Sequence, residues 1–551
     1  MRCKLLLLLI ALTTFNTFGQ TTYIFDGDGS WTDETQWKDG NYPGLTVNLN
    51  DTVEILGKLI IPEDISVTNN GTIESFSSAN GAVPDLTIRG EFKNLNTIKF
   101  SRIQINVTTT GNVVLSDSET IITNSSTFTN SGKVVVFAGG VLTLNNSTSS
   151  IINDTTGLFT NYGTVNVFNG KLENNNTYMH AIRNGATMTV TGGEIINRGG
   201  FSNDNNGHLH IKRYFNNEVT GLLINSGELS ISEFTSSLIN AGSFHNNKNV
   251  HVGDGTTLNM LDDSSFIIQS GTVTVSANGK IENRASAFEL RAGKVLNNGT
   301  INNETEILIR YSGELENNGT LKNLGAQITN LGTLTGINIE HGSHFSNDGV
   351  LSPGNSSTAI GTYRFDDFIN NYTQTASGSL NIELAGTVAG VSHDQVIVKK
   401  IATLGGTLNV TLINGFEPAI GDVFTVLYQG DGIVGSFATV NLPTLSADKE
   451  WDAVEYSDTD GVRISVKKST LSISDANAES LKYKIYPNPA SNEIFVSGIT
   501  MPSKAIIFDL NGRRILEMEL SRDKPSVELN TLEPGVYFLN VETKTFKFVK
   551  I

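Results

Sequence analysis

The feature that most constrains this chain is a turn phrase that recurs through a long stretch without proline. The phrase is Asn, one residue or none, Gly, a spacer and then an aliphatic residue. Its copies include Asn69-Asn-Gly71-Thr-Ile73, Asn161-Tyr-Gly163-Thr-Val165, Asn225-Ser-Gly227-Glu-Leu229, Asn297-Asn-Gly299-Thr-Ile301, Asn317-Asn-Gly319-Thr-Leu321, Asn330-Leu-Gly332-Thr-Leu334 and Asn347-Asp-Gly349-Val-Leu351. No proline occurs between Pro84 and Pro353. Asn and Gly accept left-handed backbone geometry at low cost, so the phrase predicts tight turns between short strands.

These repeats predict an all-β fold whose main part is an irregular right-handed β-solenoid. Short runs such as Val134–Phe137 and Thr272–Val275 have room for only a few ladder bonds each. In stacked coils every strand is hydrogen-bonded on both sides, and proline would remove a donor, which explains its absence. We also expect Asn side chains at equivalent turns to bond to one another along the axis. The alternative is a series of antiparallel β-sandwich domains with clearer modular boundaries.

The charge of the chain argues against two classes of partner. The net charge is −17; residues 1–19 and residues 482–551 contribute +2 each, so the region between them carries −21. Nucleic-acid phosphates need Lys and Arg, so we expect no nucleic acid partner. The same acidity disfavours direct docking on anionic lipid.

The N-terminus has the pattern of a secretory signal peptide. Arg2 and Lys4 precede an apolar run, Leu5–Leu12, that is too short to span a membrane. Gly19 and Gln20 flank the expected cleavage site. The single cysteine, Cys3, leaves with this segment, so the mature protein should hold neither a disulfide nor a thiolate metal site.

The last seventy residues alternate apolar and polar side chains around turn residues. They contain Tyr483-Lys-Ile-Tyr-Pro487-Asn488-Pro489-Ala490, Asn511-Gly512 between two alternating runs, Leu532-Glu-Pro534-Gly535-Val-Tyr537, and Phe546-Lys547-Phe-Val-Lys550-Ile551. Such alternation predicts a small antiparallel β-sandwich, with a hairpin at Asn511-Gly512.

This segment resembles the C-terminal sorting domain of cargo proteins of the type IX secretion system of Bacteroidetes. By residue match, the recognition or fold-defining positions are Pro487, Asn488, Gly512, Gly535, Tyr537 and Lys547. The resemblance implies export to the outer cell surface with the type IX machinery as partner. It further implies that the tail is cut off, in the polar link between Lys467 and Lys482, and that the passenger is coupled to surface lipopolysaccharide or released.

Two further segments resemble the passenger regions of autotransporter-like adhesins. One is Phe25-Asp-Gly-Asp-Gly-Ser-Trp31 with Gln36-Trp37, whose two Trp residues are expected to cover the first coil. The other begins with Leu351-Ser-Pro353-Gly354, continues at Tyr372 and includes Asp394-Gln-Val-Ile-Val398 and Gly421-Asp422-Val-Phe-Thr-Val426. The expected domains are a signal peptide (1–19), an N-terminal cap (20–66), a solenoid (67–371), a β-rich end-cap module (372–467), a linker (468–482) and the sorting domain (483–551).

The sequence offers isolated reactive residues but no catalytic constellation. His208 and His210 share one face of a strand, yet no third metal ligand is evident. Asp262-Asp263 is expected in a turn, and Asp26-Gly-Asp28 departs from the calcium-loop pattern at its sixth and twelfth places. We therefore expect no catalytic residue, metal ion or cofactor.

The expected function is that of a secreted, surface-attached, adhesin-like protein without enzymatic activity, binding glycans or other cells. The alternative is a polysaccharide lyase or hydrolase built on a β-helix, because such active sites assemble across coils. That alternative requires three or more carboxylates that converge with Lys, Arg or His in one groove of the solenoid.

Overall fold

The computed structural model describes residues 20–75, 83–324, 327–337, 339–341, 344–354, 360–365, 372–469, 483–542 and 544–551. Within these ranges the only helices are two short 3₁₀ turns, η1 (Glu34–Gln36) and η2 (Lys38–Gly40), and all other regular structure is β-strand. None of the helices found there is long and apolar enough to cross a membrane. The expected signal peptide lies outside the described residues, as does most of the expected linker.

The chain forms two compact units. The first holds the residues up to Leu445 together with Trp451–Lys467, and the second holds Ser446–Glu450 and Lys468–Ile551. Each unit has a hydrophobic core of its own.

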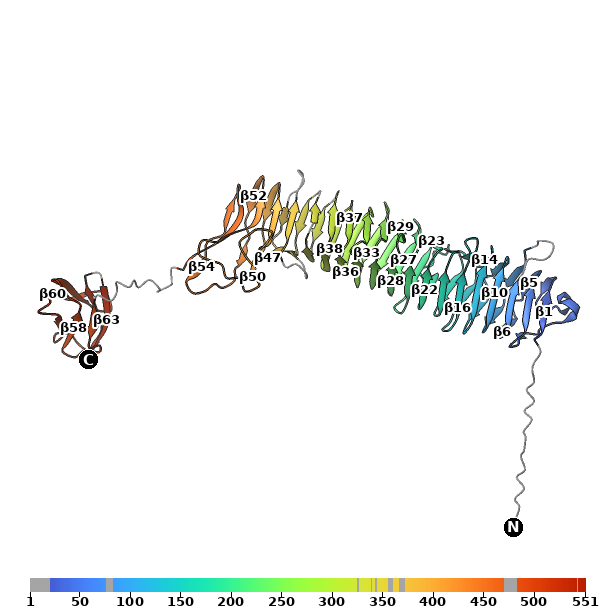
Figure 1. Cartoon of the computed structure of the whole chain (residues 1–551), viewed down its shortest axis with the longest axis horizontal. Coiled ribbons are helices and arrows are strands. Elements are labelled where there is room, and N and C mark those ends of the chain that lie inside the picture. The colour runs from blue at the N-terminus through green and yellow to red at the C-terminus, as the bar shows by residue number, and fades with distance from the viewer. Residues whose placement is uncertain are drawn as a thin grey trace, which may run out of the picture. The chain divides into compact units, whose positions relative to one another are not determined.

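The first unit is a β-solenoid, as predicted. Most coils supply three short strands, and the strands of one coil pair in parallel with their counterparts in the next, so that they form stacks (Figure 1). One coil consists of β22 (Thr187–Val190), β23 (Glu194–Asn197) and β24 (Gly200–Asn203), and the next of β25 (His208–Ile211), β26 (Tyr214–Asn217) and β27 (Leu222–Asn225). We call the columns that begin with these three strands the first, second and third stacks. The parallel pairing excludes the alternative of antiparallel sandwiches for this unit.

Alternation along each strand separates the core from the surface. In β25, Leu209 and Ile211 are fully buried, whereas His208 and His210 point outward. Inward residues of successive coils stack on like residues. In the third stack the rings of Phe244, Phe266 and Phe288 follow one another at centroid distances of 5.3 and 5.1 Å. First-stack strands such as β25 bury two apolar side chains, whereas β26 and β27, in the second and third stacks, each bury one apolar side chain and one Asn. Summed over many coils, the burial of these apolar side chains supplies the main stabilisation.

Buried Asn side chains form ladders at the ends of the strands, which confirms the prediction of bonding between equivalent turns. In the second stack each Nδ2 donates to the next Oδ1 at 2.6–2.9 Å, along Asn130, Asn153, Asn174, Asn197, Asn217 and Asn240. In the third stack the distances are 2.7–2.8 Å, along Asn161, Asn184, Asn203, Asn225 and Asn246. None of these side chains is more than 1% exposed. A buried amide needs such partners, because an unpaired one costs about 1–3 kcal/mol.

The glycine of the turn phrase has a different role from the one predicted. None of the phrase glycines quoted above has a left-handed φ. A Cβ on Gly163 would instead lie 2.3 Å from the carbonyl oxygen of Phe137 and 2.4 Å from that of Gly140, one coil earlier. The turns therefore require glycine because the backbone of the neighbouring coil approaches closely, and the left-handed explanation is wrong for these positions.

Both ends of the solenoid are closed by packed structure. Trp31 and Trp37 are 0% and 2% exposed, and their rings meet edge to face at 5.2 Å against the first coil, as expected. At the other end, parallel pairing continues past residue 371 through β47 (Ser379–Leu384), β50 (Thr407–Leu412) and β53 (Thr439–Asn441). It ends where β51 (Val423–Gln429) pairs antiparallel with β56 (Gly461–Lys468). An antiparallel strand at this position covers an otherwise unpaired edge.

The second unit is the predicted small antiparallel β-structure. One sheet contains β57 (Lys484–Tyr486), β58 (Glu493–Ser497) and β61 (Ser526–Glu528). The other contains β59 (Ser503–Phe508), β60 (Arg514–Leu520), β62 (Gly535–Val541) and β63 (Lys544–Lys550). The turn between β59 and β60 contains Gly512 at φ 77°, so the hairpin is confirmed.

Candidate functional site

Two of the residues predicted for the sorting signal, Asn488 and Tyr537, make hydrogen bonds within the second unit. Asn488 joins its segment to β63, since its Nδ2 donates to the carbonyl of Lys547 at 2.9 Å and its Oδ1 accepts from the amide of Val549 at 2.9 Å. Tyr537 donates to the carbonyl of Glu533 at 2.9 Å and stacks on Phe548. Both side chains therefore contribute to the fold.

The other predicted positions are turns or exposed residues. Gly512 lies in an open hairpin, where an added Cβ would meet no heavy atom within 4 Å, and Gly535 begins β62. Pro487 and the side chain of Lys547 are exposed, so they are available to a receptor. Of the two expected cleavage residues, Gly19 lies outside the described residues and Gln20 is exposed. Their roles in sorting and cleavage stay predictions.

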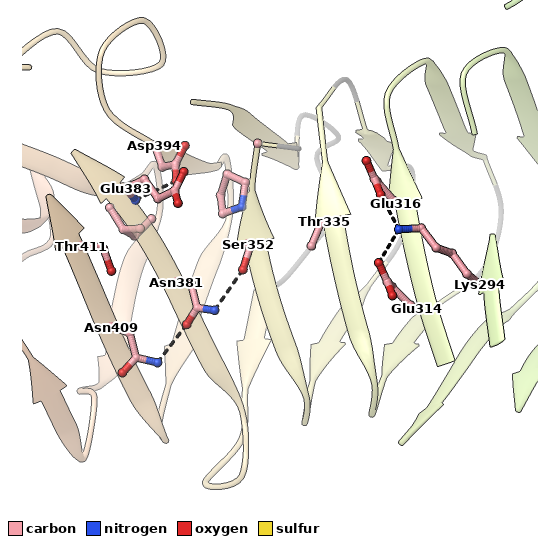
Figure 2. A pocket seen from close by; sticks show the side chains of 13 residues that line it. Lys294, Glu314, Glu316, Thr335, Ser352, Asn381, Glu383, Asp394, Asn409 and Thr411 are labelled. Atoms are coloured by element: carbon pink, nitrogen blue, oxygen red, sulfur yellow. Dashed lines mark hydrogen bonds and ion pairs between the residues drawn. The ribbon is translucent and has the colours of Figure 1, made fainter. Parts of the chain in front are cut away.

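A groove of about 610 Å³ crosses the outer face of the first stack near its C-terminal end (Figure 2). We call it the carboxylate groove. The strands that line it are β36 (Ala287–Asn297), β38 (Ile307–Asn317), β41 (Thr333–Gly336), β44 (Val350–Pro353), β47 and β50. The residues that carry its polar groups are Lys294, Glu314, Glu316, Thr335, Ser352, Asn381, Glu383, Asp394, Asn409 and Thr411.

One end of the carboxylate groove holds a compact ion cluster. The Nζ of Lys294 lies 2.7 Å from Glu314 and 2.5 Å from Glu316. Burial alone would lower the pKa of Lys294, but the hydrogen bonds to the two carboxylates raise it overall. The lysine therefore stays charged at neutral pH and is a poor candidate for a general base.

The other end is formed by Glu383 and the buried Asp394. The two carboxylate oxygens of Asp394 accept the backbone amides of Gly361 at 2.7 Å and Glu383 at 2.8 Å. Burial raises the pKa of Asp394 to about 8, against the lowering effect of these hydrogen bonds. Burial also raises the pKa of Glu383. Asp394 thus holds two backbone segments together.

The two ends of the groove lie three coils apart. Glu316, Thr335, Ser352 and Asn381 follow one another on successive coils, with Asn381 donating to Ser352 at 3.1 Å. Three strand spacings amount to roughly 14 Å. Paired glycosidase carboxylates lie about 5–9.5 Å apart. Figure 2 shows Thr335 and Ser352 between the two acidic ends. The groove therefore holds carboxylates and a lysine, but in two separate clusters.

The histidines predicted to share a face do so. The rings of His208 and His210 stack at 6.1 Å, and His210 bonds to Ser230 at 2.9 Å. His210 and His251 also line a polar groove of about 330 Å³. No group of three or more His, Cys, Asp or Glu suited to a metal occurs among the described residues. Asp262-Asp263 lies in a turn, as expected, with φ 61° at Asp263.

A third groove, of about 450 Å³, was not predicted. Tyr162, Arg183, Gly185, Asp204, Asn205, Asn206 and Ser226 line it. The one sequence feature that could have indicated this groove is the aromatic residue Tyr162, which stands between Asn and Gly in one copy of the repeated turn phrase, Asn161-Tyr162-Gly163. Sequence reasoning missed the groove because its residues come from four coils.

Comparison with known families decides the nature of the second unit. Residues 484–551 match the family described as secretion system C-terminal sorting domain. Residues 484–551 of the second unit are a C-terminal sorting domain. The protein is therefore cargo of the type IX secretion system, exported to the cell surface or beyond.

Comparisons with curated proteins and with solved structures give no information about function. No curated protein matches the chain. Among solved structures, the Haemophilus influenzae Hap adhesin is similar at 12% identity with a TM-score of 0.32, covering 76% of this chain and 64% of that one. The match thus spans just under two thirds of the Hap adhesin chain, and at this level it does not bear on function.

Proposed function

We propose that the exported protein is an adhesin-like binding protein of the cell surface, without enzymatic activity, whose solenoid contacts glycans. The observation that carries this proposal is the polar outer face of the first stack. Its outward side chains form columns across successive coils, for example Thr189, His210, Ser230, His251 and Thr274. Hydroxyl, imidazole and amide groups at a regular strand spacing of about 4.8 Å suit repeated hydrogen bonds to a polymer of sugars.

The separation of the acidic clusters in the carboxylate groove supports binding over catalysis. A lyase or hydrolase needs a proton donor and acceptor beside the same bond. Here the lysine is bonded to two glutamates, and Asp394 is occupied by two backbone amides. We also propose, from the resemblance of the tail to sorting domains, that the passenger is coupled to surface lipopolysaccharide or released after the tail is removed.

The test is a glycan-array screen of the chain without its expected signal peptide, Gln20 to Ile551, with reducing-sugar release and unsaturated-sugar absorbance measured on every bound glycan. We expect binding without turnover. Catalytic release of sugar that Glu383→Gln abolishes would contradict the proposal and establish the enzyme. Absence of binding to any glycan would contradict it as well.

A further inference from the structure

The groove at Tyr162 owes its shape to the lengths of successive turns between the third and first stacks. The turns after β18 (Leu158–Asn161) and β21 (Ile182–Asn184) have two residues each, Tyr162-Gly163 and Gly185-Ala186. The turns on either side are longer, with four residues each, 137–140 and Asp204–Gly207. Two short turns between two long ones leave a notch at this edge, and we call it the tyrosine notch.

The ring of Tyr162 forms one wall of the notch and rests on the next coil. A Cβ on Gly185 would lie 2.9 and 3.0 Å from the Cδ1 and Cε1 atoms of this ring. The φ of Gly185 lies outside the left-handed region, so its backbone does not itself demand glycine. The missing side chain is what allows the ring to lie against the coil. Tyr162 is nevertheless 43% exposed, with Phe137 beside it at 6.3 Å.

The other side chains that line the notch are polar, and together they carry no net charge. The Nε and Nη2 atoms of Arg183 donate to the same oxygen of Asp204 at 3.0 and 2.6 Å, which leaves the second carboxylate oxygen and Nη1 for a ligand. Asn205, Asn206 and Ser226 add amide and hydroxyl groups to the lining. The nearby Lys248, which donates to the carbonyl of Asn205 at 3.0 Å, is itself paired with Glu228.

We propose that the tyrosine notch is a binding subsite for one neutral pyranose residue of a glycan. A pyranose has an apolar face of C–H groups that packs on an aromatic ring, and neighbouring hydroxyls that both donate and accept hydrogen bonds. Tyr162 supplies the ring, and the Arg183–Asp204 pair supplies a donor and an acceptor side by side. The balanced charge disfavours an anionic sugar. From the Tyr162 turn to the Asp204 turn is two strand spacings, about 10 Å, which accommodates one sugar ring.

This inference rests on the proposed glycan binding, and it locates one binding subsite at the tyrosine notch. The test uses the same chain, Gln20 to Ile551, and the methyl glycosides of glucose, galactose and mannose, with methyl glucuronide as the anionic comparison, in saturation-transfer NMR titrations. We expect at least one neutral glycoside to bind, and the glucuronide to bind more weakly. Tyr162→Ala should weaken binding about tenfold, whereas Tyr162→Phe should retain it because the ring remains.

Tyr311 provides the matched control, because it lies on the corner between the same two stacks, further along the solenoid, and is 79% exposed. Tyr311→Ala should leave the affinity unchanged, and circular dichroism should show all three variants folded. If Tyr162→Ala binds the glycoside like the wild type while the array still shows glycan binding, the notch assignment is wrong and the proposed function stands. If no neutral glycoside binds, the assignment is also wrong, and the array alone then decides the broader proposal.

Discussion

At the scale of single residues, the buried Asn ladders do what a hydrophobic core cannot. Stacked leucine or phenylalanine side chains pack almost equally well when one coil shifts relative to the next, so they specify the register only weakly. A buried Asn amide accepts a hydrogen bond from the Asn of one coil and donates one to the Asn of the next. A shift in register breaks these hydrogen bonds and leaves buried polar groups unpaired, which destabilises the fold strongly. The ladder of Asn197, Asn217 and Asn240 thus fixes which turn lies above which.

Replacing one ladder residue should cost much more than replacing its outward neighbour. In Asn217→Ala the buried amides of Asn197 and Asn240 each lose a partner, so we expect destabilisation of about 2–4 kcal/mol. Asn216→Ala, on the same strand but half-buried, should cost less than about 1 kcal/mol. Chemical denaturation of the two variants measures the difference. Equal losses would show that the ladder has no special role.

Asp394 should make stability depend on pH in a defined direction. Its pKa in the folded state is about 8, above the ordinary value near 4, so the folded state binds the extra proton between these limits. Stability should therefore fall as pH rises from about 4 to 8, by at most about 1.4 kcal/mol per pH unit for this group. Asp394→Asn should remove that slope. Unfolding curves from pH 4 to 8 test this, and an unchanged slope in the variant would refute the assignment.

At the scale of elements, the coil is the unit of construction. Along the stacks a strand pairs with the strands one coil before and one coil after it, as β28 (Glu228–Ile231) does with β25 and β31 (Asn249–Val252), so stability is approximately a sum over neighbouring coils. The turn glycines belong to this scale too: Gly163 is required by the backbone of the preceding coil and not by its own conformation.

Removing one whole coil should therefore be tolerated, and removing half of one should not. Deletion of His208–Gly227 joins Gly207 to Glu228 and places β28 (Glu228–Ile231) where β25 was, with the inward and outward faces preserved. We expect a folded protein with modestly reduced stability. Deletion of His208–Asn217 removes β25 and β26, so β27, a third-stack strand, would follow the turn that leads into the first stack, and we expect this chain to fail to fold. Circular dichroism and thermal unfolding distinguish the two, and similar behaviour would argue against modular coils.

At the scale of the whole molecule, the two units have different roles. The second unit has its own core and carries the export signal, while the solenoid presents the extended polar surface. We expect deletion of Tyr483–Ile551 to leave the passenger folded but retained in the periplasm. Fractionation followed by immunoblotting checks this, with the single substitution Lys547→Ala as a milder test of recognition. Full-yield secretion of the truncated protein would exclude the sorting role.

The sequence by itself determined the periodic β architecture, the tight turns and the sorting tail. Local residue types dictate all three: the Asn-x-Gly phrase, the alternation of apolar residues and the motif around Pro487 and Asn488. It also predicted that turn asparagines would bond across coils. Its explanation for the glycines was wrong, because a close approach from another coil leaves no mark in the local sequence.

Only the tertiary structure decided where surface residues meet. Glu316 and Glu383 line one groove yet lie three coils apart, and Tyr162, Arg183 and Asp204 share a notch although up to 42 positions separate them in the chain. The physical reason is that a coil contains roughly twenty residues, and this number varies from one coil to the next. Which residues meet across coils therefore depends on the lengths of all the coils between them, and no short stretch of sequence specifies those lengths.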